Sequence, residues 1–245
     1  MNVPTLYPLI MLASLVAGIA LSRPRQKRLG LTDRQRLAIG LGAFCGGMLG
    51  SKLPFALSDP HGVFCSQAWL SDGKTILFGL VGGYLGVELA KVLVDVQTKT
   101  GDTFAIPLAV AIGIGRWGCF VAGCCHGIPT SLPWGVNFGD GLFRHPTQLY
   151  ETAFHLTAAV ILWLLERRKL FPTQRLKLYF LAYCVYRILS EFIRPEVPLI
   201  AHLTGYQWAA IVLIPVLVWL WHRDQEAFKA LRPSRGQTTA IVQRP

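Results

Sequence analysis

The sequence predicts an all-α integral membrane protein with seven transmembrane helices, and three observations support this prediction. Hydrophobic residues make up 52% of the 245 residues and charged residues only 15%, a composition typical of polytopic membrane proteins. Apolar runs recur along the chain at the length that crosses the hydrocarbon layer, about 20 residues. Basic residues collect in alternate segments between these runs. We therefore expect a single seven-helix domain over 1–222 and a basic, flexible cytoplasmic tail over 223–245.

Each expected helix is an apolar run bounded by polar residues. The first run is not a cleavable signal peptide, because the leading residues MNVPTLYPLI carry no basic side chain and the positive charges follow the run. It is expected to stay in the protein as a helix. The seven helices are expected near 4–21, 37–57, 75–94, 104–125, 148–166, 176–193 and 203–221.

The distribution of Lys and Arg predicts the orientation of these helices. Segments 22–36 and 167–177 and the tail are rich in both residues, whereas the alternate loops carry only Lys74, Arg144 and Arg194. By the positive-inside rule, the N-terminus lies outside and the C-terminus is cytoplasmic. The net charge of +11 therefore faces anionic lipid, and we expect no nucleic-acid partner.

Glycines recur at short helical spacings in the second and third expected helices. Gly46 and Gly50 lie in the second helix, and Gly79, Gly82 and Gly86 lie in the third. Glycine lets two membrane helices bring their backbones close together. The sequence thus predicts that both helices pack closely against neighbouring helices.

Charged residues also occur inside the apolar runs, toward the expected outer side of the membrane. Arg116 lies in the fourth helix, and Glu151 opens the fifth. In the sixth helix, Arg187 and Glu191 share one face through their four-residue spacing, and Arg194 follows closely. A charge at this depth is costly unless it is paired or hydrated, so it marks a candidate functional site.

Two interpretations of these charges are open for any single pair. Arg116 could pair with Glu151, and Arg187 with Glu191, only to hold helices together. For the whole set, the surplus of positive charge near the headgroups favours an anion, and the planar guanidinium suits phosphate. A phospholipid headgroup is the anion most available there.

The six cysteines do not follow a disulfide pattern. Most of them lie within expected membrane helices, where a small buried thiol is the commoner explanation. The C-x4-C-C-H run from Cys119 to His126 lacks the paired C-x2-C spacing of zinc modules. We therefore expect neither a metal nor another cofactor. The cysteines are Cys45, Cys65, Cys119, Cys124, Cys125 and Cys184.

Several motifs, in order along the chain, resemble those of the bacterial prolipoprotein diacylglyceryl transferases. GRWGCF at 115–120 is similar to the family's Gly-Arg-x-Gly-Asn-Phe, and HPTQLYE at 145–151 is similar to its His-Pro-Ser/Thr-Gln-Leu-Tyr-Glu box. YCVYRILSEFIRP at 183–195 resembles the segment Tyr-Gly-x-x-Arg-x-x-x-Glu-x-x-Arg, and TGYQW at 204–208 resembles the Gly-Gln-Trp of the last helix. Tyr7, which is followed here by Pro8, resembles the tyrosine of an N-terminal Tyr-Gly.

The resemblance implies a membrane transferase of the bacterial cytoplasmic (inner) membrane with its active site toward the outer leaflet. Such enzymes move the diacylglyceryl group of phosphatidylglycerol onto the lipobox cysteine of a preprolipoprotein and release glycerol phosphate. Cleaving that C–O bond requires neutralisation of the leaving phosphate, which Arg116 and Arg187 could provide. The attacking thiol also needs a base. His145 is a candidate, whereas Glu151 or Glu191 could orient the arginines.

These considerations give a set of candidate site residues in three groups. The candidate catalytic residues are Arg116, His145, Glu151, Arg187 and Glu191. The candidate substrate-binding residues are Tyr7, Tyr150, Tyr183, Arg194 and Gln207, and the candidate accessory residues are Cys119 and His126.

The chain departs from the family's pattern at three places. The third-helix segment LFGLVGGYLG lacks the family's histidine before Gly-Gly, and Cys119 replaces an asparagine. Ala122-Gly123-Cys124 replaces the family's Asn-Gly-Glu, and much of the family's external arm between the fourth and fifth helices is absent. The general base is therefore open, and His126 is one candidate substitute. Alternatives are another acceptor or lipid headgroup, or a non-catalytic lipid-binding or thiol-redox protein.

Overall fold

The computed structural model describes the backbone of residues 3–58 and 75–230 and the side chains of residues 6–55 and 75–226. Almost all regular structure in these residues is helical. The helices are α1 (Val3–Lys27), α2 (Asp33–Ser58), α4 (Ile76–Leu93), α5 (Gly101–Val121), α6 (Thr147–Arg167), α7 (Arg175–Ser190), the 3-10 helix η2 (Glu191–Ile193) and α8 (Gly205–Ala230). The two short strands are β1 (Val136–Asn137) and β2 (Phe143–Arg144).

Some of the sequence-based expectations fall on other parts of the chain. Cys65, Lys74 and residues 231–245 of the expected tail lie outside the described residues. The first part of that tail is helical, because α8 continues to Ala230.

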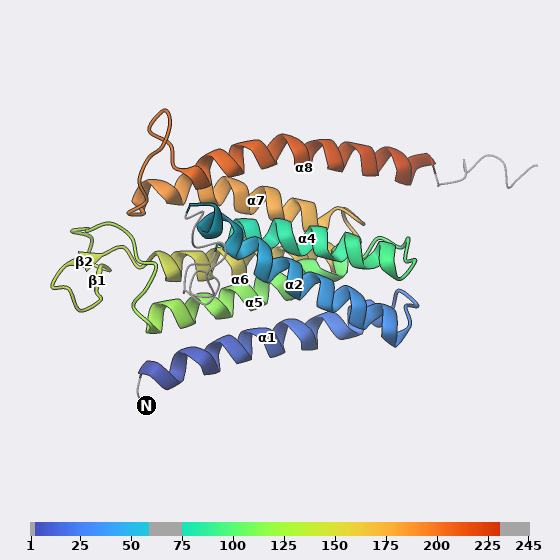
Figure 1. Cartoon of the computed structure of the whole chain (residues 1–245), viewed down its shortest axis with the longest axis horizontal. Coiled ribbons are helices and arrows are strands. Elements are labelled where there is room, and N and C mark those ends of the chain that lie inside the picture. Colours follow the sequence, from blue (N-terminus) through green and yellow to red (C-terminus); the bar gives the residue numbers. More distant parts are fainter. Residues whose placement is uncertain (1–2, 59–74, 231–245) are drawn as a thin grey trace, which may run out of the picture.

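The α-helices run roughly along the long axis of the molecule, and the strands project beyond one end of the bundle (Figure 1). The strands form an antiparallel hairpin in which Val136 lies opposite Arg144 and Asn137 opposite Phe143. This hairpin lies in the connection between α5 and α6. We call its end of the molecule the hairpin end.

Six of the described helices are long and apolar enough to cross a membrane, which confirms an all-helical membrane protein. These segments are Leu6–Lys27, Asp33–Phe55, Ile76–Leu93, Gly101–Val121, Thr147–Arg167 and Gly205–Glu226. The remaining helix, α7, is shorter at 16 residues because the chain passes into η2 after Ser190.

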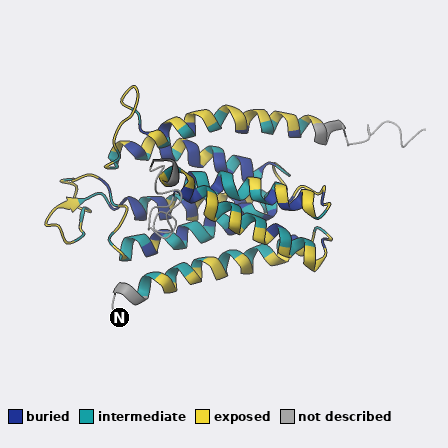
Figure 2. Cartoon of the chain, viewed as in Figure 1, coloured by how far each residue is buried: buried dark blue, intermediate teal, exposed yellow. Residues whose placement is uncertain are grey.

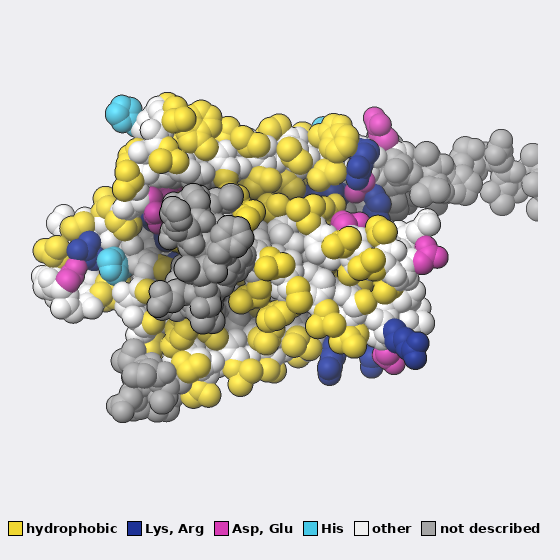
Figure 3. Space-filling model, in the orientation of Figure 1, with side chains coloured by type: hydrophobic (Ala, Val, Ile, Leu, Met, Phe, Trp, Pro, Cys, Tyr) yellow, Lys and Arg dark blue, Asp and Glu magenta, His cyan; other side chains and the backbone are white. Residues whose placement is uncertain are grey.

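The sides of the bundle are apolar, and its charged side chains collect at the ends. Large hydrophobic residues point outward, including Leu12 at 57%, Leu41 at 53% and Leu89 at 62% exposure, and exposed residues follow the outer helix faces (Figure 2). Hydrophobic side chains cover the visible flank, whereas Lys and Arg gather near the α1–α2 turn and the end of α8 (Figure 3). An apolar surface of this extent suits lipid rather than water.

The expected close packing at these glycines is confirmed, and the structure shows the partners, since α2 and α4 lie against each other. A Cβ atom on Gly46 would overlap the carbonyl oxygen of Gly82, and one on Gly82 would overlap that of Gly46. Only glycine fits at both positions, so the sequence itself fixes this contact.

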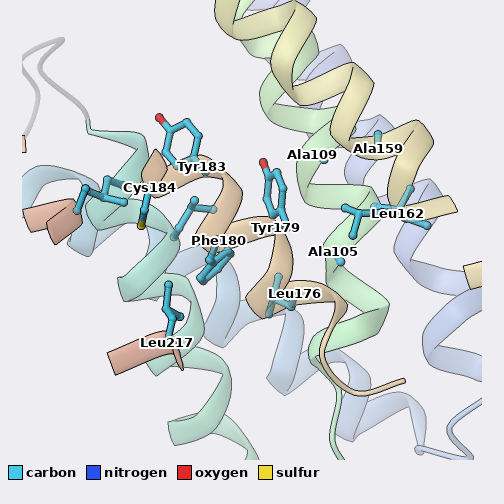
Figure 4. Packing of buried hydrophobic residues seen from close by; sticks show 14 residues of the cluster. Ala105, Ala109, Ala159, Leu162, Leu176, Tyr179, Phe180, Tyr183, Cys184 and Leu217 are labelled. Carbon is cyan, nitrogen blue, oxygen red and sulfur yellow. The ribbon is translucent and has the colours of Figure 1, made fainter. Parts of the chain in front are cut away.

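Helix α7 lies at the centre of the core and contacts α5, α6 and α8. Its residues Tyr179 and Tyr183 are each only 1% exposed and pack in one cluster with Ala105 and Ala109 of α5 and Ala159 of α6. Both tyrosine hydroxyls point the same way from α7 (Figure 4). The polar site described below is built around these two tyrosines.

Ion pairs between helix ends lock the end of the bundle opposite the hairpin. Arg25 of α1 lies 3.1 Å from Glu166 of α6, and Arg175 of α7 lies 2.9 Å from Asp102 of α5. The ends of sequence-distant helices therefore meet in one layer, as an up-and-down arrangement requires.

The end of α5 differs from the expected end at residue 125, because the helix stops at Val121. Gly123 takes the left-handed conformation with φ 67°, which is the usual way to end a helix. Its N–H donates to the carbonyl of Phe120 at 3.1 Å, and the N–H of Cys124 donates to that of Cys119 at 3.1 Å. Cys124 and Cys125 consequently lie in a turn rather than in a membrane helix.

Candidate active site

A buried ion pair between α5 and α6 forms the first part of the site, and we call it the first pair. Arg116 Nε lies 2.8 Å from Glu151 Oε2, with the two side chains only 8% and 2% exposed. The Tyr183 hydroxyl of α7 donates a 2.6 Å hydrogen bond to Glu151 Oε1. Three helices thus meet at one carboxylate, which fixes the direction of the guanidinium.

His155 of α6 extends this network. It lies one turn after Glu151, is fully buried, and places Nε2 3.9 Å from Glu151 Oε1. Its Nδ1 lies 2.8 Å from the Tyr179 hydroxyl. The four-residue spacing from Glu151 was the available sequence signal.

A second ion pair, which we call the second pair, joins α7 to η2. Arg187 Nη2 lies 2.6 Å from Glu191 Oε2. The Thr204 hydroxyl donates to Glu191 Oε1 at 3.1 Å, and the Thr204 N–H donates to Gln207 Oε1 at 2.9 Å. Gln207 therefore orders the start of α8 and supports the carboxylate through Thr204.

The two pairs form one electrostatic unit. Glu151 interacts electrostatically with Arg187 as well as with Arg116. Arg194 adds a third guanidinium and Glu196 a third carboxylate, so three positive groups face three carboxylates. Among the described residues, Arg116 Nη2 and Arg194 Nε have no hydrogen-bond partner. Buried guanidinium donors without a partner suit an anionic ligand.

His145 lies just before α6 and is held by its neighbours. Its Nδ1 lies 3.3 Å from the Tyr150 hydroxyl, which accepts a 2.8 Å hydrogen bond from Trp134 Nε1. The backbone of His145 pairs with residues 127 and 128, and the Ile128 N–H donates to the Ile193 carbonyl at 3.0 Å. This strip of backbone ties the α5–α6 connection to η2.

The cysteines form the other polar group at the hairpin end. Cys119 Sγ accepts a 3.5 Å hydrogen bond from Arg116 Nη1. Hydrogen bonds shared with Cys119 and Cys124 lower the pKa of Cys125, with the positive charges of Arg116 and Arg194 acting in the same direction, while the same sharing raises the pKa of Cys124. The turn that carries Cys124 and Cys125, which we call the cysteine turn, is therefore adjacent to the predicted arginine site.

Comparison with known proteins identifies the family. The model described as prolipoprotein diacylglyceryl transferase matches residues 4–223. The chain belongs to this family. A phosphatidylglycerol–prolipoprotein diacylglyceryl transferase of Clostridium tetani is 32% identical over 201 residues, covering 78% of this chain and 80% of that protein. One from Nitratidesulfovibrio vulgaris is 33% identical over 238 residues, covering 87% of this chain and 88% of its own length.

The family match spans every candidate site residue, and the structure brings most of them together. The two pairs, Tyr183, Arg194 and Gln207 form the connected network described above. Tyr7 of α1 packs against Gly118 of α5, next to the helical turn of α5 that carries Arg116. His126 points elsewhere: its Nδ1 lies 3.3 Å from the Gly127 carbonyl, and its ring stacks on Phe138.

Two residues of the family's histidine box contribute in a way that sequence reasoning missed. Gln148, which is fully buried, donates to the Cys124 carbonyl at 2.5 Å. Thr147 donates to the Cys125 carbonyl at 2.7 Å. Their place inside the His-Pro-x-Gln-Leu-Tyr-Glu box was the signal, but only the tertiary contact shows that they hold the cysteine turn.

Proposed function

We propose that this chain transfers the diacylglyceryl group of phosphatidylglycerol to the lipobox cysteine of a preprolipoprotein, with Arg116 and Arg187 binding the phosphate. The observation that supports this assignment best is the buried, electrostatically joined network of the first and second pairs. It lies at the positions of the family's arginine and glutamate motifs, and two of its buried guanidinium nitrogens have no hydrogen-bond partner among the described residues. A phosphodiester headgroup is the anion that fits such donors in a membrane.

The chemistry is a displacement at the glycerol carbon that bears the phosphate. The acceptor sulfur forms a bond to that carbon while the C–O bond to phosphorus breaks, and glycerol phosphate leaves with the bonding electrons. The guanidinium groups of Arg116 and Arg187 stabilise the negative charge that develops on the leaving phosphate. The thiol proton passes to a base, for which His145 is the family-box candidate.

The remaining candidate residues divide into orienting and binding roles. Glu151 and Glu191 orient the two arginines, because each carboxylate is itself held by a second donor. Tyr183 and Gln207 support those carboxylates directly or through Thr204. The third guanidinium, Arg194, binds the headgroup together with the aromatic side chains Tyr7 and Tyr150.

We also propose that α7 and η2 together form a seventh membrane span. The 16 residues of α7 extend ~24 Å, and the three residues of η2 add ~6 Å. The sum matches a hydrocarbon thickness of ~30 Å. With an odd number of spans and with the basic segments in the cytoplasm, the N-terminus and the hairpin end lie on the outer side of a bacterial inner membrane.

The test is transfer from labelled phosphatidylglycerol to a lipobox peptide by the wild-type protein, Arg187→Ala and Arg175→Ala. Arg175 is a matched control, since it also pairs with a carboxylate, Asp102, but lies at the opposite end of α7. Arg187→Ala should lower the rate by about 100- to 1,000-fold, whereas Arg175→Ala should keep the wild-type rate per folded molecule.

Two results would contradict this assignment. Equal losses in both arginine variants would mean that the arginines act through folding alone. No thioether formation by folded wild-type protein would mean that the site serves another acceptor or headgroup, and a panel of other phospholipids and thiols would then identify it.

A further inference from the structure

Three thiols that the proposed mechanism leaves without a role converge after the last turn of α5. The Sγ atoms of Cys119, Cys124 and Cys125 all lie within 4.8 Å of one another. Four-coordinate zinc, with Zn–S bonds of about 2.3 Å, needs sulfur–sulfur separations of about 3.8 Å. Small rotations of the side chains would close this gap. The C-x4-C-C spacing did not reveal the cluster, because the turn that folds it back is a feature of the tertiary structure.

The turn that carries these thiols is held firmly in place. Cys125 has φ 61°, which is uncommon for a residue with a side chain and persists only where its surroundings impose it. The Cys124 N–H donates to the Cys119 carbonyl at 3.1 Å. Thr147 and Gln148 of α6 hold the carbonyls of Cys125 and Cys124. The cluster is therefore preorganised by two helices.

The electrostatic surroundings favour a negatively charged sulfur cluster. Arg116 donates from Nη1 to Cys119 Sγ at 3.5 Å, and its buried Nη2 has no partner among the described residues. Three thiolates around a divalent cation carry one net negative charge, which the adjacent guanidinium of Arg116 partly offsets. Hydrogen bonds to ligand atoms from outside the ligand set are what tune and orient metal sites.

The cluster offers three ligands and leaves room for a fourth. Cys124 and Cys125 are exposed and Cys119 is half-buried. Within the part of the chain that the structure describes, no other His, Cys, Asp or Glu joins the group. The ring of His126 is turned toward Phe138. Catalytic zinc sites have this arrangement, with three protein ligands and one open position for water or substrate.

We propose that Cys119, Cys124 and Cys125 bind a zinc ion whose open position takes the acceptor thiol of the lipobox peptide. This inference rests on the proposed function and deepens it, because it supplies a means of ionising that thiol. A metal-bound thiol is deprotonated outright. With zinc bound, coordination would ionise the thiol before it attacks, and His145 would not be needed as its base.

The reaction balances without any redox change. On coordination, the acceptor thiol releases its proton to solvent. Its sulfur then bonds to the glycerol carbon as the C–O bond to the phosphate breaks, and glycerol phosphate leaves beside Arg116. The product is a neutral thioether, which is a weaker ligand than a thiolate, so water displaces it from the metal.

The first experiment measures metal binding by the full-length protein in detergent. Wild-type protein, the triple variant Cys119→Ser/Cys124→Ser/Cys125→Ser and the control Cys45→Ser are reduced, stripped with chelator and titrated with Zn²⁺. We expect one tightly bound zinc per chain in wild type and in Cys45→Ser, and none in the triple variant. Cys45 is a suitable control because it is an exposed cysteine on α2, outside the cluster.

The second experiment asks whether the acceptor thiol binds the metal. Co²⁺ replaces zinc, and the visible spectrum is recorded with a lipobox peptide or with the same peptide carrying serine in place of cysteine. The cysteine peptide should change the cobalt bands and add thiolate-to-cobalt charge transfer, and the serine peptide should not. This readout does not depend on lipid transfer.

The third experiment compares transfer rates with and without metal. A free thiol with a pKa near 8.5 is ionised to about 3% at pH 7, so removing zinc should lower the rate by about 10- to 30-fold, and adding zinc should restore it. Any one of three results would overturn the proposal. These are transfer that is equally fast without metal, absence of zinc binding, and cobalt bands that do not change when the cysteine peptide is added. A cobalt response to the thiol without any lipid transfer would uphold the metal site and refute the proposed function instead.

Discussion

Replacing Arg116 and Glu151 separately and together distinguishes a structural ion pair from a phosphate-binding arginine. The variants are Arg116→Met, Glu151→Gln and the double variant. Each single change leaves one charge buried without its partner, in a pair only 8% and 2% exposed. Such a loss costs about 3–5 kcal/mol, which corresponds to a fall of roughly 6–20 °C in the unfolding midpoint for a chain of this size.

The double variant removes both charges, and its stability should recover. Replacing a buried ion pair by neutral groups is often neutral or stabilising, and the amide that replaces the Glu151 carboxylate would still accept the hydrogen bond from Tyr183. Its transfer rate should not recover, because one preorganised donor to the developing phosphate charge is worth about 100- to 1,000-fold. The assays are thermal unfolding in detergent and transfer of labelled lipid to a lipobox peptide.

The decisive quantity is the rate of the double variant relative to its stability. A double variant with the wild-type midpoint and the wild-type rate would refute the phosphate role, since the pair would then only join α5 to α6. A double variant that is stable and inactive would support it.

Three further changes test the packing and the hydrogen bonds of the site. Gly46→Ala should destabilise the protein by about 1–3 kcal/mol because the new methyl group overlaps α4. The control Gly40→Ala faces open space and should be neutral or stabilise the protein by up to ~1 kcal/mol. Equal unfolding midpoints for the two variants would contradict this packing. Tyr183→Phe removes the hydroxyl that binds the carboxylate of the first pair and should cost about 1.5–3 kcal/mol, seen as a lower midpoint, whereas an unchanged midpoint would mean that water replaces the hydroxyl. Thr204→Val removes a donor to the second pair and should cost about 1–3 kcal/mol, and a stability equal to wild type would show that this carboxylate does not need it.

Much of the site could be predicted because its charges are local features of single helices. Arg187 and Glu191 share one face of a helix at a spacing of four residues, and the structure pairs them at 2.6 Å. The pairing of Arg116 with Glu151 followed from the expected arrangement of the fourth and fifth helices, and it too is present. A charge in an apolar run has few possible partners, so the number of alternatives was small.

The sequence by itself determined the helical membrane architecture, the family motifs and the presence of two glycine-rich helices suited to close packing, whereas the structure showed that these two, α2 and α4, pack against each other. Apolar run lengths, basic segments and paired glycines express constraints that act on each helix or on neighbouring helices. The tertiary structure alone decided that α5 ends at Val121 and that three thiols meet after it. It also decided that Thr147 and Gln148 hold that turn. These contacts join different elements, and their geometry depends on how the helices pack, which no local pattern encodes.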